Sequence, residues 1–151
     1  MWWRGGLLAS LLVCAGLASA IDAQAPDVRG AWRAEQYALK DGPVHEVAGR
    51  IFFTSTDWTV LFFVRHDGQL KRASAEGGTY TLSGDQLVFT HLFNYSSGQA
   101  VPGLAESPLQ MVARDGAGAP TERCRVELAG DRLTIRFPSG NAMMFRRSST
   151  P

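Results

Sequence analysis

TERCRVELAGDRLTIRF, residues 121–137, alternates apolar and polar side chains on both sides of a central Gly-Asp pair. In the first half Cys124 and Val126 fall on one face of an extended chain, and in the second half Leu133 and Ile135 do the same. A period of two is typical of strands that have one buried and one wet face, as in antiparallel sheets. The pattern therefore predicts two antiparallel strands joined by a tight turn.

The same turn signal occurs twice along the chain. Residues 82–87 and 128–133 both have the form Leu-x-Gly-Asp-x-Leu. Glycine adopts a positive φ at little cost and aspartate caps turns through its side chain, so each motif predicts a reversal between paired strands. A third reversal is expected at residues 138–141, Pro-Ser-Gly-Asn.

Short runs rich in β-branched and aromatic residues recur along the chain after its first twenty residues, with no long helical period among them. Such runs predict strands at residues 30–39, 50–55, 58–65, 78–82, 86–95, 109–114, 121–129, 132–137 and 142–147. The fold class that follows is all-β, an antiparallel up-and-down barrel of roughly 8–10 strands. An odd number of strands cannot close such a barrel, so these boundaries either miss a strand or divide one in two.

The connections between these strands alternate in length. Segments 40–49, 66–77 and 96–108 are long, whereas 55–58, 82–86 and 114–121 are short. Alternate connections of an up-and-down barrel lie at the same end, so the long segments should gather at one mouth and the turns should close the other. Residues 69–73, inside the second long segment, are expected to form one helical turn.

Length and composition indicate one globular domain. The chain has 151 residues, of which 45% are apolar and 19% charged. Fifteen basic residues against fourteen acidic ones give no reason to expect a nucleic acid or an anionic membrane surface as a partner.

Residues 1–20 have the form of a secretory signal peptide, with Arg4 before an apolar run and a small-x-small site ending at Ala20. A second such site ends at Ala25. We therefore expect export to the periplasm or the exterior, a barrel domain at residues 26–151, and no stable membrane anchor after cleavage. An uncleaved anchor is the alternative. Cys14 leaves with the signal peptide, so Cys124 would have no disulfide partner.

Several short motifs occur in an order that resembles one protein family. The chain has Gly30-Ala31-Trp32, residues 49–54 (Gly-Arg-Ile-Phe-Phe-Thr), residues 78–85 (Gly-Thr-Tyr-Thr-Leu-Ser-Gly-Asp), His91, and a closing Arg146-Arg147. This succession resembles the bacterial lipocalin-like domain family of the lipocalin/calycin superfamily. The resemblance implies a lipocalin-like barrel whose closure involves Gly30, Trp32, Arg146 and Arg147, the indole packing beneath a guanidinium from the last strand.

Six residues are candidates for contact with a ligand: His91, Tyr80, Tyr37, Phe53, Phe62 and Phe93. If its strand is regular, His91 shares a face with Phe89, Phe93 and Tyr95, and an imidazole on an apolar wall can bond a ligand or transfer a proton. The tyrosines could offer hydroxyls and the phenylalanines could line a pocket. The alternative for all six is a packed core without a cavity.

Three functions are compatible with these features. The first is a binding protein that holds a small apolar or amphipathic molecule, with His91 and one tyrosine at its polar end. The second is a barrel enzyme of isomerase, cyclase or hydratase type, with His91 as acid–base beside Tyr80 or Glu35. The third is a structural or interaction domain with a filled barrel, in which the doubly apolar strands around Phe52 and Phe63 meet a partner.

The sequence gives no reason to expect a metal or a cofactor. The three histidines, His45, His66 and His91, lack paired spacing, and Cys124 stands alone. No catalytic residues are assigned from the sequence, and the oligomeric state is not predicted.

Overall fold

The computed structural model describes residues 25–148, which form nine β-strands and no helix. The strands are β1 (Gly30–Ala38), β2 (Val44–Phe53), β3 (Asp57–His66), β4 (Gln69–Ser83), β5 (Gln86–Gly98), β6 (Ser107–Ala113), β7 (Thr121–Ala129), β8 (Arg132–Arg136) and β9 (Ala142–Arg147). Each predicted strand overlaps one of these. The expected signal peptide at residues 1–20 lies outside the described residues. Among residues 25–148 there is no helix long and apolar enough to cross a membrane.

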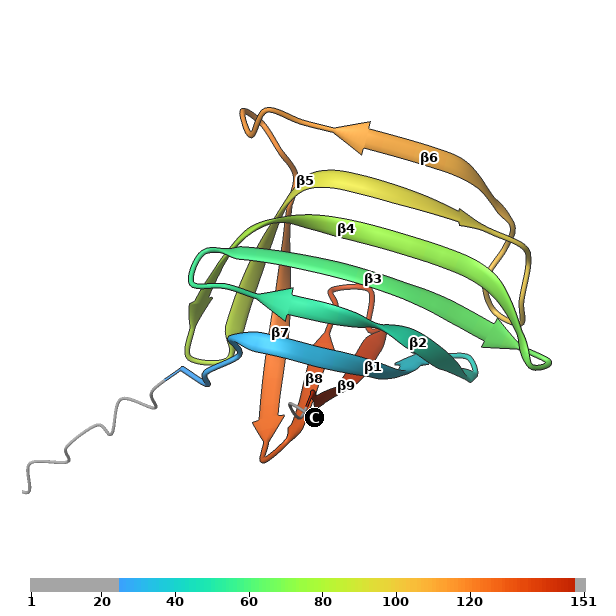
Figure 1. Ribbon diagram of the computed structural model, residues 1–151, viewed down its shortest axis with the longest axis horizontal. Helices are drawn as coiled ribbons and strands as arrows, with labels where there is room; N and C mark the ends of the chain where they lie inside the picture. The colour runs from blue at the N-terminus through green and yellow to red at the C-terminus, as the bar shows by residue number, and fades with distance from the viewer. Residues whose placement is uncertain (1–24, 149–151) are drawn as a thin grey trace, which may run out of the picture.

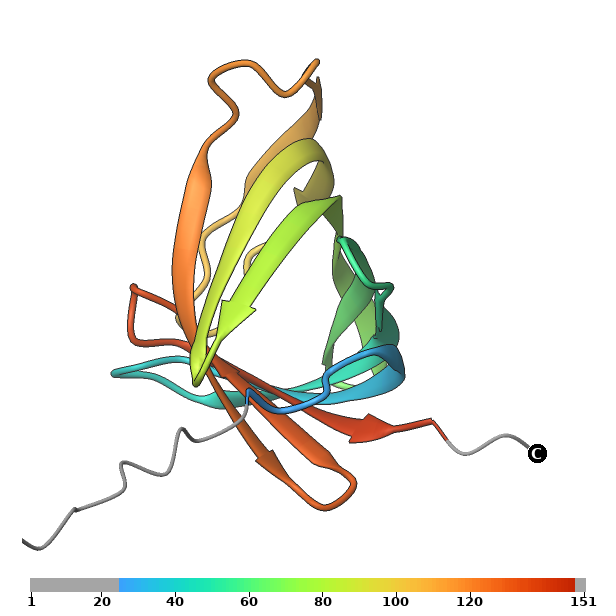
Figure 2. The same cartoon turned by 90° about the vertical axis from the view of Figure 1, so that its left-hand side faces the viewer.

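The strands close into an antiparallel up-and-down barrel, as the alternation predicts (Figures 1 and 2). The order β4-β3-β2-β1-β9-β8-β7-β5 returns to its start because β5 also pairs with β4. Eight strands therefore form the barrel.

The ninth strand explains the odd count. Residues 86–90 of β5 pair with β7, whereas residues 93–98 pair with β6 along the same edge of β5. Two strands thus occupy one barrel position in succession, and residues 114–120 connect them. The sequence divides this position in two because polar residues, two glycines, two alanines and Pro120 interrupt its apolar pattern.

Both Leu-x-Gly-Asp-x-Leu motifs form two-residue turns. Gly84 and Gly130 occupy the first central position with φ of 56° and 61°. A positive φ at this position alone is the type II′ arrangement, whose twist matches that of the paired strands.

The helical turn expected at residues 69–73 is wrong, because these residues begin β4. Asp67 and Gly68, with φ of 51° and 72°, form a two-residue turn that pairs His66 with Gln69. Asp-Gly is a strong signal for a type I′ hairpin turn. The expected long segment 66–77 is therefore mostly strand, although its turn lies at the same barrel end as the β1–β2 and β5–β6 connections.

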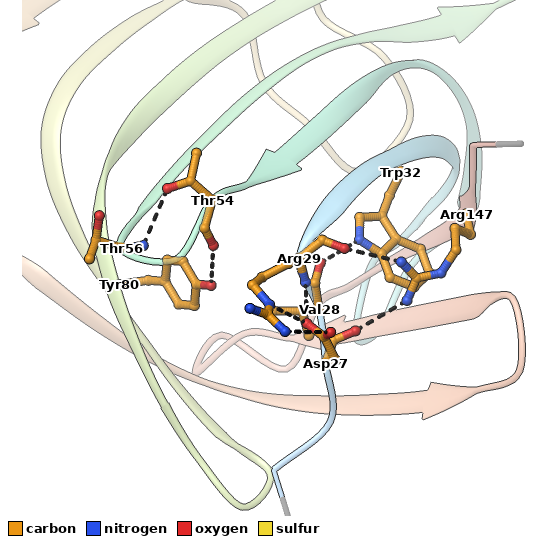
Figure 3. A network of polar contacts seen from close by, with 8 residues as sticks. All are labelled: Asp27, Val28, Arg29, Trp32, Thr54, Thr56, Tyr80 and Arg147. Atoms are coloured by element: carbon orange, nitrogen blue, oxygen red, sulfur yellow. Dashed lines mark hydrogen bonds and ion pairs between the residues drawn. The ribbon is translucent and has the colours of Figure 1, made fainter. Parts of the chain in front are cut away.

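The side chain of Trp32 fills the opposite end of the barrel (Figure 3). Its side chain is fully buried, and its indole Nε1 donates a hydrogen bond of 2.7 Å to the carbonyl oxygen of Val28. The guanidinium of Arg147 lies 4.0 Å from the centre of the indole and donates hydrogen bonds to the backbone oxygens of Arg29 and Asp27. These bonds fix the segment before β1 across the barrel end.

Of the four residues expected at barrel closure, Gly30, Trp32 and Arg147 lie together. Gly30 has φ of 109°, a conformation that disfavours other residues, and a Cβ there would contact the Arg147 guanidinium. Arg146 lies elsewhere because adjacent strand residues point to opposite faces. It pairs with Glu35 at 2.9 Å and Asp131 at 2.7 Å.

Candidate functional site

A β-bulge in β5 decides which side chains face the barrel interior. Gly77 pairs with Phe93 and Gly78 with His91, so Leu92 is the extra residue. A Cβ on Gly78 would lie 2.0 Å from the carbonyl oxygen of Thr90, which requires glycine at this close approach. After the bulge, odd-numbered residues of β5 point out of the barrel, whereas before it they point inward.

The expectation that Phe93 lines a pocket with His91 is therefore wrong. Phe89 and His91 face inward, whereas Phe93 and Tyr95 point outward and are 44% and 48% exposed. The ring of Phe93 lies against Gly77 on the outer surface, where a Cβ would meet it at 2.2 Å.

The barrel interior holds a partly open cavity of about 200 Å³. All eight barrel strands contribute lining residues. Its aromatic lining consists of Tyr37, Trp58, Phe62, Phe89, Phe137 and Phe145, and its polar lining of Glu76, His91, Glu122 and Ser139. The cavity is thus mostly apolar with polar groups concentrated at a few positions, which is the usual character of a small-molecule site.

Three of the six expected ligand contacts line this cavity: Tyr37, Phe62 and His91. The hydroxyl of Tyr37 accepts a hydrogen bond of 2.8 Å from Asn141 Nδ2. Burial raises the pKa of Tyr37, so its hydroxyl stays protonated near neutral pH.

Phe53 and Tyr80 belong to the core at the closed end. Their rings meet edge to face with centroids 5.1 Å apart, and Phe53 is buried. The Tyr80 hydroxyl donates a hydrogen bond of 2.7 Å to the carbonyl oxygen of Thr54 (Figure 3). Neither residue lines the cavity: Phe53 ends β2, and Tyr80, on β4, packs against it beside the β2–β3 turn.

His91 lies between two carboxylates. Its Nδ1 is 3.0 Å from Glu76 Oε2, and its Nε2 is 3.6 Å from Glu122 Oε2. Glu122 and Glu76 raise the pKa of His91 to about 9, although burial works in the opposite direction. His91 is therefore an imidazolium at neutral pH, and the Glu76–His91–Glu122 triad carries a net charge of about −1.

Glu76 is the more buried of the two carboxylates. Burial alone would raise its pKa, but the contacts with His91 and Ser74 outweigh burial and lower it. Ser74 Oγ donates a hydrogen bond of 3.0 Å to Glu76 Oε1. The other oxygen of Glu76 faces His91, so the protein holds this carboxylate from both sides.

Sequence reasoning missed both glutamates. Glu76 falls in a segment expected to be a loop, so no face could be assigned to it. Glu122 did leave a signal, because it has the same parity as Cys124 and Val126 on an otherwise apolar face. A charge at such a position indicates a polar group that points into the barrel.

The triad also borders an open depression on the outside of the barrel. Pro120, Thr121, Arg123 and Pro138 line this depression together with the triad. The backbone N–H of His91 donates a hydrogen bond of 3.0 Å to the carbonyl oxygen of Pro120, just before β7 begins. The triad thus lies between the cavity and solvent. It lies at the point along β5 where the neighbouring strand changes from β7 to β6.

The partners expected for an acid–base His91 are not beside it. Tyr80 bonds Thr54, and Glu35 forms ion pairs with Arg33 at 3.0 Å and Arg146 at 2.9 Å. Among residues 25–148, no group of three or more His, Cys, Asp or Glu side chains is arranged to hold a metal ion.

Comparison with family models, curated proteins and solved structures finds no match to this chain.

Proposed function

We propose that this chain is an exported, lipocalin-like binding protein that holds a small amphipathic molecule in the barrel cavity. The observation that carries the proposal is the aromatic-lined cavity inside the barrel, with one charged triad in its wall. The sequence of residues 1–20 supports export, and the stacking of Arg147 on Trp32 agrees with what the lipocalin-like resemblance implies.

The size of the cavity limits the ligand. An apolar protein cavity of about 150 Å³ accommodates benzene. A cavity of about 200 Å³ therefore has room for one ring with a short substituent. The ring would contact Phe62 and Phe89, and the substituent would reach the triad.

The charge of the triad selects the polar end of the ligand. Two unit charges 4 Å apart interact by about 4 kcal/mol at an effective dielectric constant of 20. Two carboxylates against one imidazolium therefore attract a cation and repel an anion. Within the described residues no lysine or arginine lines the cavity beside the triad, although Arg72 lines an adjoining pocket that shares Tyr37, Phe62 and Glu76 with it. We infer that the ligand carries an ammonium or another donor group, because both nitrogens of His91 already face carboxylates.

The same contacts argue against His91 as a general base. A general base must be unprotonated near the working pH. With a pKa of about 9, His91 is mostly protonated at pH 7. An imidazolium between two carboxylates is suited instead to fixing the positions of those two carboxylates.

Calorimetric titration at pH 7 with 2-phenylethylamine, 2-phenylethanol and phenylacetate tests the proposal. The amine should bind about tenfold more tightly than the alcohol, and the acid should bind most weakly, because a charge-assisted hydrogen bond adds about 1.5–3 kcal/mol. If none of the three binds at millimolar concentration, the cavity is not a small-molecule site. If the alcohol or the acid equals the amine, the site binds ligands but does not select a cation.

Two glutamine variants of β7 supply the control. Glu122→Gln should remove most of the preference for the amine and leave alcohol binding within about threefold. Glu127→Gln removes a carboxylate that pairs with Arg136 on the outer surface, at 2.9 Å. It should leave both affinities unchanged.

A further inference from the structure

The pocket that adjoins the cavity differs from it in chemistry. It has a volume of about 230 Å³ and shares Tyr37, Phe62 and Glu76 with the cavity. The lining that it does not share is largely polar and consists chiefly of Arg72, Ser74, Ser96, Ser97 and Ser107. A molecule in the cavity that extends past the shared side chains would therefore enter polar surroundings.

Arg72 and the triad lie on one inner face of β4. Arg72, Ser74 and Glu76 share that face because side chains alternate along a strand, and all three line the adjoining pocket. The pairing of β4 is regular from residue 72 to residue 76, which places the Cα atoms of Arg72 and Glu76 about 13 Å apart. The charge of Arg72 also reaches Tyr37, whose pKa burial raises and the guanidinium lowers in part.

Gly98 allows the Arg72 side chain to cross β5. The two residues pair directly, and a Cβ on Gly98 would lie 2.6 Å from Cγ of Arg72. The Nη1 atom of Arg72 donates hydrogen bonds of 2.8 and 2.6 Å to the carbonyl oxygens of Gln99 and Ala105. A guanidinium has five N–H donors, and within residues 25–148 the three on Nε and Nη2 have no partner. These three donors can serve a bound anion.

The β5–β6 connection, residues 99–106, partly covers the adjoining pocket. Leu104 lines the pocket, and Val101, which exchanges backbone hydrogen bonds with Leu104, is buried. His45, also buried, donates a hydrogen bond of 3.0 Å from Nε2 to the carbonyl oxygen of Pro102. An ion pair beneath this connection meets less water than one on the open surface, so its attraction is stronger.

We propose that the ligand is a zwitterion whose ammonium group lies at the triad and whose carboxylate binds Arg72 in the adjoining pocket. This inference rests on the proposed function, in which the cavity holds a small amphipathic molecule. The triad carries a net negative charge and Arg72 a positive one, so a molecule with two charged ends meets a favourable partner at each.

A benzene ring with its two substituents in para positions suits this arrangement. It holds the charged ends apart, and its face can lie against Phe62, which lines both spaces. To reach Arg72, phenylacetate would have to withdraw its ring from Phe89, which lines the cavity but not the adjoining pocket. An acid without an ammonium group therefore gains little from Arg72.

Calorimetric titration at pH 7 with three amines tests the proposal. 4-(2-aminoethyl)benzoate carries both charges, 4-(2-aminoethyl)benzamide replaces the carboxylate with a neutral amide of similar size, and 2-phenylethylamine has neither group. The benzoate should bind about tenfold more tightly than the benzamide, because a hydrogen bond between charged groups is stronger than one to a neutral amide.

Two arginine variants separate recognition of the carboxylate from support of the barrel. Arg72→Gln should bring the affinity of the benzoate to within about threefold of that of the benzamide, and should leave benzamide binding within about threefold of its original value. Arg65→Gln is the control. Arg65 pairs with Glu46 at 3.6 Å and lines neither space, so this variant should keep the tenfold ratio.

The three amines distinguish failure of this inference from failure of the proposed function. If none of them binds at millimolar concentration, the proposed function is refuted and the zwitterion with it. If 2-phenylethylamine binds but the benzoate does not exceed the benzamide, the zwitterion alone is refuted. An equal loss for all three amines in Arg72→Gln would also overturn it, because Arg72 would then only hold the β5–β6 connection in place.

Discussion

Replacing Trp32 with alanine is expected to lower the free energy of unfolding by about 3–5 kcal/mol, as for other fully buried aromatic residues. The indole is fully buried, bonds Val28 and stacks on Arg147. Its removal opens a cavity at the closed end of the barrel and leaves the guanidinium without its aromatic partner. Single domains are stable by only about 5–15 kcal/mol, so the loss is a large share of the total. Urea unfolding followed by far-ultraviolet circular dichroism measures it.

Phe52 provides the matched control for Trp32. Its ring is 44% exposed on the outer face, and it pairs in β2 with Ala31, the neighbour of Trp32. Phe52→Ala should cost less than about 1 kcal/mol, because surface truncations leave no cavity. An equal loss for the two variants would show that the indole does not close the barrel.

Stability is expected to fall as the pH rises from about 6.5 to 9. The pKa of His91 is about 9 in the folded protein, above the ordinary value of 6.5 that applies to the unfolded chain. Stabilisation by the His91 ion pairs is therefore complete below pH 6.5 and is lost as the pH rises through 9. Part of the imidazole meets solvent, which reduces the full linkage value, and the expected loss is on the order of 2 kcal/mol.

His91→Gln isolates this effect. Glutamine cannot titrate, so the difference in urea midpoint between the native protein and the variant should be large at pH 6 and small at pH 9.5. On the acid side the lowered pKa of Glu76 acts in the opposite sense, and its contribution is lost as the pH falls below about 4.5. A midpoint difference that is constant from pH 6 to 9.5 would show that the carboxylates do not hold His91 in its charged form.

Local patterns were sufficient for much of the fold. Alternation through residues 121–137 appears as β7 and β8, with Cys124, Val126, Leu133 and Ile135 buried. The Gly-Asp motifs appear as two-residue turns. These features depend on side-chain period and turn conformation, which neighbouring residues determine.

The candidate site was only partly accessible to the same reasoning. His91, Tyr37 and Phe62 were named and do line the cavity. Phe93 was assigned to the wrong face because the extra residue opposite Gly78 reverses the alternation. A shift of one residue exchanges the two faces of a strand, and nothing in β5 by itself marks where the shift occurs.

The sequence by itself determined an all-β chain and its main hairpins, because each rests on contacts between residues close in the chain. Only the tertiary structure decided that β6 and β7 share one edge of β5, and that Glu76 and Glu122 meet His91. The triad joins β4, β5 and β7, so its charge arises from strand register across the closed barrel. That register is set by the packing of the whole core, which no single segment encodes.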